Sequence, residues 1–209
     1  IMLNVVAVIY LVWLLNLYNF MDGIDGIAAI ETITVCLGGA LLYFIVGESL
    51  YAGVPLLLAA TVVGFLVWNF PPARIFMGDA GSGFLGLVLG ILTIQAAGVQ
   101  QQLFWSWLIL LGVFIVDATM TLLTRLAQGH KIYEAHRSHA YQHAAQDFGS
   151  HLTITMAVFV INLFWLLPMA MFVACGKLEG FLGLVIAYFP LVILAATLKK
   201  NVNNHQSIV

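Results

Sequence analysis

Charged residues are scarce in this sequence. Asp, Glu, Lys and Arg together make up 8% of its 209 residues, whereas soluble domains carry about 25%. Hydrophobic residues make up 63% of the chain, and the mean hydropathy is +1.06. A water-soluble fold cannot hide this much apolar surface, so the composition indicates a protein whose solvent is lipid. The net charge of -2 gives no reason to expect a nucleic-acid partner.

Cysteine is nearly absent as well. Cys36 and Cys175 both lie in apolar runs, and their spacing fits neither a zinc site nor a disulfide framework, so we interpret them as packing residues. A cleavable signal is also lacking, because the chain begins inside an apolar run at Ile1 with no charged region before it. We therefore expect that an N-terminal piece precedes this sequence.

Apolar segments of about the 20 residues that a bilayer core needs recur along the chain. They predict an all-α, polytopic transmembrane bundle that forms one domain over residues 1–209. The segments are 2–19, 27–46, 53–70, 83–99, 103–124, 152–174 and 179–198. The links between them alternate in character. Three are rich in polar residues (20–26, 71–82 and 125–151) and would share one face, while the other three are short and bland.

The basic residues orient this bundle. Only Lys177 lies on the face of the short links. The others lie on the face of the polar-rich links: Arg74, Arg125, Lys131, Arg137, Lys199 and Lys200. Because Lys and Arg are retained on the cytoplasmic side of membranes, the polar-rich face is predicted to be cytoplasmic.

The first polar-rich link, within NLYNFMDGIDGIAA, places a polar residue at every third position: Asn16, Asn19, Asp22 and Asp25. In a continuous α-helix these side chains would turn away from one another, so they converge only if the helix ends or tightens. Two carboxylates and two amides at a membrane surface suit a hard cation such as Mg²⁺. The alternative is a solvated turn with a helix-capping Asp.

The second link reads PPARIFMGDAGSG, and Asp79 is its only acid. Glycines 78, 81 and 83 would leave backbone N–H groups accessible just before the next helix, where they bind phosphate well. No Lys-Ser/Thr follows the glycines, so the motif is not a P-loop. The alternative is a Gly-rich turn with Asp79 as its helix cap.

The third link contains KIYEAHRSHAYQHAAQ. A helix here would place His136, His139 and His143 on one face, beside Arg137. His and Arg side chains could bind and neutralise oxyanions. A zinc site is one alternative, although the Glu of HExxH is missing from this spacing. A solvated basic helix is the other.

One further acid, Asp117, lies inside the fifth apolar segment. Intramembrane acids are functional by default. A structural partner such as Thr119, Thr121 or the region of Arg125 would explain it equally well, so its role stays open.

Taken together, NFMDGIDGIAA, RIFMGDAGSGFLG and HRSHAYQHA resemble the polyprenyl-phosphate N-acetylhexosamine-1-phosphate transferase family. The resemblance covers essentially the whole chain, and the form of the His-containing link is most similar to the branch that initiates bacterial O-antigen chains. It implies transfer of a sugar-1-phosphate from a UDP-sugar to undecaprenyl phosphate, with release of UMP, in the bacterial inner membrane. The resemblance is also compatible with a homodimer.

The resemblance further implies roles for individual residues. Asp79 and Asn19 would bind Mg²⁺, or Mn²⁺ in its place, with Asp22 in the same acidic site. Asp25 would face the uracil ring and Phe76 would stack on it. His139 would contact the pyrophosphate or sugar, and it is predicted to be catalytic together with Asp22, Asp25 and Asp79. Further substrate contacts are predicted for Asn16, Asn19, Gly78, His136, Arg137 and His143.

The family also carries an adjacent Asp-Asp pair on an earlier link, and no two Asp residues are adjacent here. On this interpretation the helices that carry the pair precede the chain, and residues 1–209 alone lack part of the active site.

Two other classes fit less well. CDP-alcohol phosphotransferases share the start of their motif with Asp22 and Asp25, but Ile30, Tyr43 and Gly47 stand where that motif needs Arg and two Asp residues. A transporter would place its polar residues near the bilayer midplane, whereas here they gather at one surface.

Overall fold

The computed structural model describes residues 2–129 and 139–206, and side chains are described as far as residue 198. The described residues form helices joined by short turns. In chain order these are α1 (Met2–Met21), α2 (Ile27–Ile45), η1 (Ser49–Ala52), α3 (Gly53–Asn69), α4 (Gly78–Val99), α5 (Gln101–Leu110), α6 (Gly112–Ala127), α7 (Ala140–Phe148), α8 (His151–Ile161), η2 (Asn162–Leu166), α9 (Leu167–Ala174) and α10 (Gly180–Gln206).

The prediction of a polytopic membrane bundle is confirmed. Among the described residues, six helices are long and apolar enough to cross a bilayer, with α8, η2 and α9 together forming one of them. The fifth expected segment is wrong as a straight span, because α5 and α6 meet at Leu111 with a bend of 70°. A seventh span exists only if this bent pair crosses as one unit.

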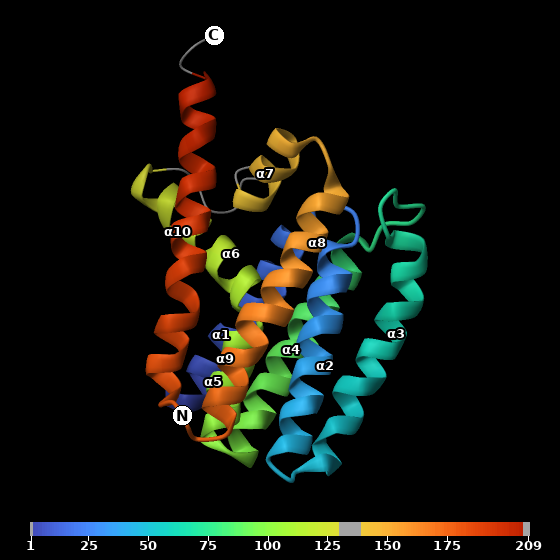
Figure 1. Ribbon diagram of the computed structural model, residues 1–209, viewed down its shortest axis with the longest axis vertical. Helices are drawn as coiled ribbons and strands as arrows, with labels where there is room; N and C mark the ends of the chain where they lie inside the picture. The colour runs from blue at the N-terminus through green and yellow to red at the C-terminus, as the bar shows by residue number, and fades with distance from the viewer. Residues whose placement is uncertain (1, 130–138, 207–209) are drawn as a thin grey trace.

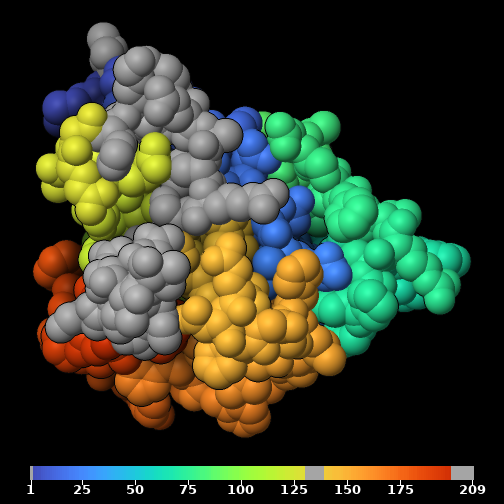
Figure 2. All heavy atoms as spheres, turned by 90° about the horizontal axis from the view of Figure 1, so that it is seen from above, coloured from blue at the N-terminus to red at the C-terminus, as the bar shows by residue number. Residues whose placement is uncertain are grey.

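The polar-rich links gather at one end of the bundle, as their alternation predicts. Figure 1 places α7, the start of α8 and the segment after α3 at one end, and the N-terminus at the other. Seen from the first end in Figure 2, the blue segment around the first link lies between the green segment after α3 and the orange α7–α8 segment. Link residues that are distant in sequence are therefore neighbours.

Local sequence explains how the first two links turn. Gly26 adopts a φ of 76°, a left-handed conformation that suits glycine, and α2 begins directly after it. Pro71 and Pro72 follow α3, where proline cannot continue a helix. The Gly26 N–H donates to the Asn69 side-chain oxygen at 3.0 Å, which ties the start of α2 to the end of α3.

Close helix packing fixes the position of the first link relative to the second. In α4, Gly86 lies directly against the backbone of Leu14 in α1, and a Cβ added there would lie within 3.0 Å of the Leu14 carbonyl carbon and of Tyr18. Gly83 and Gly90 face the same helix. Small residues let two membrane helices approach this closely.

A buried polar contact joins α2 to the second half of the chain. Glu31 is 0% exposed, and its carboxyl oxygen accepts a 2.6 Å hydrogen bond from the Asn162 side-chain amide. The same amide donates to Thr34 at 2.7 Å. Asn162 opens the π-helical turn η2, which lies between α8 and α9. Buried polar groups in a lipid-solvated fold need such partners, because an unsatisfied one is costly.

Candidate active site

The acidic pair Asp22 and Asp79 lies where α1 ends and α4 begins. Burial raises the pKa of the Asp22 carboxyl group to about 6, and the negative charge of Asp79 adds to the shift. The Asp79 carboxylate is therefore close enough to disfavour the charged form of Asp22. Nearby, the Ser82 hydroxyl donates to the Asn19 side-chain oxygen at 3.1 Å. The first and second links thus meet through Asn19, Asp22, Asp79 and Ser82.

The four polar residues of the first link do not converge as one set. The α-helix continues to Met21, so each step of three positions turns the side chain by about 60°. Asn16 is bonded within its own helix, where its side-chain amide donates to the Val12 carbonyl at 2.7 Å. Asp25 lies beyond the turn and contacts other elements. The expected convergence is therefore wrong for these two residues.

Asp25 joins the first link to the second and to the start of α8. Its carboxylate accepts the Ala73 N–H at 3.0 Å, and the His151 Nδ1 lies 3.4 Å from its other oxygen. The Thr155 hydroxyl donates to the Asp25 carbonyl at 2.8 Å. Phe76, in the same link as Ala73, is 78% exposed.

Sequence reasoning missed His151. It is the first residue of α8, directly after Ser150, whose hydroxyl caps the helix by accepting the Thr153 N–H at 3.2 Å. The Ser-His pair at the end of the third link was the available signal.

The second link departs from expectation at its helix. Because α4 begins at Gly78, glycines 81 and 83 lie inside the helix and not before it. Gly78 itself has a φ of 67° and a turn geometry that glycine suits. Asp79 lies in the first turn of α4, and no side chain caps this helix, so the interpretation of Asp79 as a helix cap is wrong.

The third link reaches the first through α7. Tyr141 donates its hydroxyl hydrogen to the Phe20 carbonyl at 3.0 Å, and the His139 ring stacks on Phe20 with centroids 6.2 Å apart. Gly23 faces the Tyr141 hydroxyl so closely that any side chain there would collide with it. Burial, with the nearby charge of Asp117, raises the pKa of Tyr141, so its hydroxyl stays protonated.

The expected helix through all three histidines is wrong. His139 has extended backbone (φ −74°, ψ 147°) and precedes α7 as its N-cap residue, with His143 one turn into the helix. His136 and Arg137 lie outside the described residues. His139 is 2% exposed and His143 is half-buried, so the link is not a solvated basic helix at these positions.

Metal chemistry can be tested against these groups. Within residues 2–129 and 139–198, no three His, Cys, Asp or Glu side chains are grouped to hold a metal ion, which does not support the zinc alternative. Asp22, Asp79 and Asn19 fit a different kind of ion. Two carboxylates that repel each other, beside an amide oxygen, are the ligand types that a hard divalent cation prefers.

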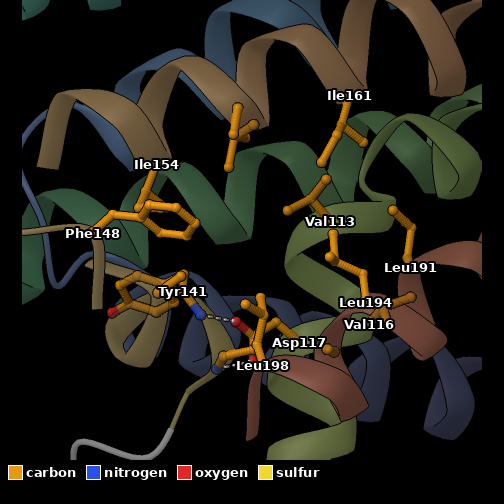
Figure 3. Close-up of a pocket in the computed structure, with 15 residues that line it drawn as sticks. Val113, Val116, Asp117, Tyr141, Phe148, Ile154, Ile161, Leu191, Leu194 and Leu198 are labelled. Atoms are coloured by element: carbon orange, nitrogen blue, oxygen red, sulfur yellow. Dashed lines mark hydrogen bonds between the residues drawn. The ribbon is translucent and has the colours of Figure 1, made fainter. Parts of the chain in front are cut away.

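A cavity of about 240 Å³ is lined in part by α7. Its walls are almost entirely apolar and come from α6, α7, α8 and α10, as Figure 3 shows, with Asp117 at its edge. Such a lining suits an apolar chain and excludes a charged nucleotide.

Part of this chain is similar to known transferases. The model of glycosyl transferase family 4 matches residues 1–97. A probable undecaprenyl-phosphate N-acetylglucosaminyl 1-phosphate transferase of Bacillus subtilis is 35% identical over 119 residues, which cover 56% of this chain and 33% of that protein. A phospho-N-acetylmuramoyl-pentapeptide-transferase of Chlamydia muridarum is 38% identical over 94 residues, 44% of this chain and 27% of that protein.

A decaprenyl-phosphate N-acetylglucosaminephosphotransferase of Mycobacterium tuberculosis (strain H37Rv) is 30% identical over 130 residues, 54% of this chain and 32% of that protein. The chain therefore spans a third or less of the length of the curated relatives it matches. The similarity reaches the first two links, since residues 1–97 contain both acidic motifs.

Proposed function

We propose that this chain, which matches the model of glycosyl transferase family 4 over residues 1–97, forms part of an enzyme that transfers a sugar-1-phosphate from a UDP-sugar to a polyprenyl phosphate and releases UMP. One observation carries the proposal. Three links from distant parts of a multi-pass membrane protein meet at one end of the bundle, through the Asp22–Asp79 pair, the Asn19–Ser82 hydrogen bond and the Tyr141–Phe20 hydrogen bond.

In this reaction an oxygen of the lipid phosphate attacks the β-phosphorus of the UDP-sugar, and the bond from that phosphorus to the UMP oxygen breaks. A phosphate monoester has a second pKa near ~6, so the lipid phosphate is mostly a dianion at neutral pH. Removal of a proton is then a smaller obstacle than the meeting of two anions. The site must neutralise charge in the transition state.

Asp22, Asp79 and Asn19 are the residues that would hold Mg²⁺, or Mn²⁺, in this site. A bound divalent cation would supply charge neutralisation at the phosphate oxygens. The chain's own residues would do the rest. His139 is held beside Phe20 and would face the pyrophosphate or sugar. His136 and Arg137, which are also proposed to contact it, lie outside the described residues.

The nucleotide would bind beside Phe76 and Asp25. Phe76 offers an exposed ring for the uracil to stack on, and Asp25 is held in place by the Ala73 amide and His151. The start of α4 at Gly78 presents unpaired backbone N–H groups, which favour a phosphate.

The membrane would supply proximity, since the lipid arrives laterally and the nucleotide from the aqueous side. The Lys and Arg residues of the polar-rich links support a cytoplasmic location of this end, in a bacterial inner membrane. Initiation of O-antigen or a related cell-envelope polysaccharide is the pathway class we propose.

The test is a UMP-release assay of the full-length protein in lipid nanodiscs, with undecaprenyl phosphate, Mg²⁺ and UDP-N-acetylglucosamine as the first donor of a panel. We expect UMP release, and we expect Asp79→Asn to abolish it while membrane insertion stays intact. Glu48→Gln is the matched control, because it neutralises an acid in a short link at the opposite end of the bundle.

Three results would contradict the proposal or part of it. Wild-type turnover in Asp79→Asn would remove Asp79 from the site. Release of CMP from a CDP-alcohol substrate would support the CDP-alcohol phosphotransferase class. Substrate movement across the membrane without any nucleotide release would support a transporter.

A further inference from the structure

Asp117 is a carboxylate within the apolar part of the bundle, on α6 after the bend at Leu111. It is 6% exposed. One carboxyl oxygen accepts the Ala140 N–H at 2.9 Å and the Thr121 hydroxyl at 3.1 Å, and the other accepts the Tyr141 N–H at 2.9 Å. Figure 3 shows the carboxylate pointing toward α7. A buried carboxylate needs such donors, because burial without them is costly.

These contacts place Asp117 at the N-terminus of α7, although it belongs to a different helix. The first amides of any helix have no partner within it, and negative charge there is favourable because of the helix dipole. Asp117 satisfies two of these amides. His139, the residue before the helix, has its Nδ1 at 3.7 Å from the same carboxylate. The His139 backbone N–H is paired separately, with the Gln142 side chain at 3.3 Å.

The anchored end of α7 is also the part that touches the first link. The Tyr141 N–H donates to the Asp117 carboxylate, and the Tyr141 hydroxyl donates to the Phe20 carbonyl. His139 is stacked on the Phe20 ring. Phe20 lies two residues before Asp22, so a short chain of direct contacts runs from Asp117 to the acidic pair.

We propose that Asp117 is a positioning residue, which holds α7 and His139 in place against the segment Phe20–Gly23. The Asp117 carboxylate is bonded to the first amides of α7, so it acts through that helix. The effect on turnover rests on the proposed function above. The docking of α7 does not, because it follows from the hydrogen bonds alone.

The experiment uses the full-length protein in nanodiscs, with UDP-N-acetylglucosamine and undecaprenyl phosphate, and compares Asp117→Ala with the wild type. Displacement of a catalytic group by about 1 Å can cost about 100-fold in rate. We expect kcat to fall by about that factor. The KM for the nucleotide sugar should stay within about threefold, because Phe76 and Asp25 are untouched. Hydrogen–deuterium exchange of peptides covering residues 140–148 should accelerate.

Two further variants separate positioning from general damage. Tyr141→Phe removes only the hydroxyl that reaches Phe20, so it should fold and show a smaller fall in kcat, about tenfold, with KM again unchanged. Ser106→Ala removes a buried hydroxyl that bonds to Ala170 in α9, far from α7, and should lower thermal stability without changing kcat.

The outcomes are distinguishable. Wild-type kcat and wild-type exchange in Asp117→Ala overturn the positioning role. Unchanged kcat in Tyr141→Phe also overturns the positioning role, because the hydrogen bond to Phe20 would then have no effect on turnover. A rise in KM that accounts for the whole loss assigns Asp117 to nucleotide binding and contradicts the proposal. If the wild type releases no UMP, the proposed function fails, and the exchange measurement still tests the docking of α7.

Discussion

Substitution of Gly86 by Ala should separate the first link from the second. A Cβ at this position falls within 3.0 Å of the backbone of Leu14 in α1, whereas ordinary contacts begin at 3.4 Å. Backbone cannot rotate away as a long side chain can, so α1 has to move away from α4 by on the order of 1 Å. Overpacking of this kind typically costs about 1–3 kcal/mol.

The displacement acts close to the candidate site. Ser82 lies one helical turn from Gly86, and its hydroxyl reaches Asn19 at 3.1 Å. A separation of about 1 Å would break this hydrogen bond and move Asp22 away from Asp79. We expect UMP release to fall by about 100-fold. The midpoint of thermal unfolding should fall in the same protein, measured by intrinsic fluorescence in nanodiscs.

Gly64→Ala is the matched control. Gly64 lies inside α3 and has open space where the Cβ would be. Alanine favours a helix over glycine by about 1 kcal/mol, so this variant should be as stable as the wild type or more so, and fully active. Equal behaviour of the two variants would refute the claim that the α1–α4 approach sets the geometry of the site.

Two further predictions follow from groups described above. Because the pKa of Asp22 is raised to about 6, protons compete with a cation there, and the Mg²⁺ concentration for half-maximal activity should fall as pH rises from 5 to 7. A flat wild-type profile would contradict the assignment of Asp22 to the cation site. Asn162→Ala leaves the buried Glu31 carboxyl group without its 2.6 Å partner and should lower the free energy of unfolding by about 1–3 kcal/mol. The midpoint of unfolding should fall while KM is unchanged. An unchanged midpoint would show that the contact contributes nothing to stability.

Most of the spans and their approximate lengths could be predicted from the sequence because the bilayer imposes them. A helix of about 20 apolar residues is the shortest unit that satisfies its own backbone across lipid. The same rule does not predict the bend at Leu111. The run 103–124 contains no proline, and Gly112 is its only local mark, so the 70° turn arises from packing that no local pattern reveals.

The candidate site was predictable in part. The Asp-Gly repeats and the Gly-Asp motif marked the first two links correctly as neighbours, because alternating spans bring every second link to one face. The histidines were misplaced for a physical reason. Their spacing fits a helix, but the helix begins at Ala140, where Asp117 accepts its first amides from 23 residues away. A tertiary contact of that kind overrides local periodicity.

The pairing of Glu31 with Asn162 was invisible for a similar reason. Glu31 is the only charged residue in its apolar run, and Asn162 is the only side-chain amide in its own. They lie 131 positions apart, and nothing local indicates that one would meet the other. His151 is a milder case, since only its contact with Asp25 gives it a place in the site.

The attachment of α7 to α6 affects how this protein can diversify. Asp117 binds main-chain amides, and amides are present whatever side chains the gripped helix carries. Mutations at water-facing positions such as Gln146 and Asp147 can therefore accumulate without loosening the attachment. The surface of α7 can therefore vary while the lipid-embedded scaffold stays unchanged.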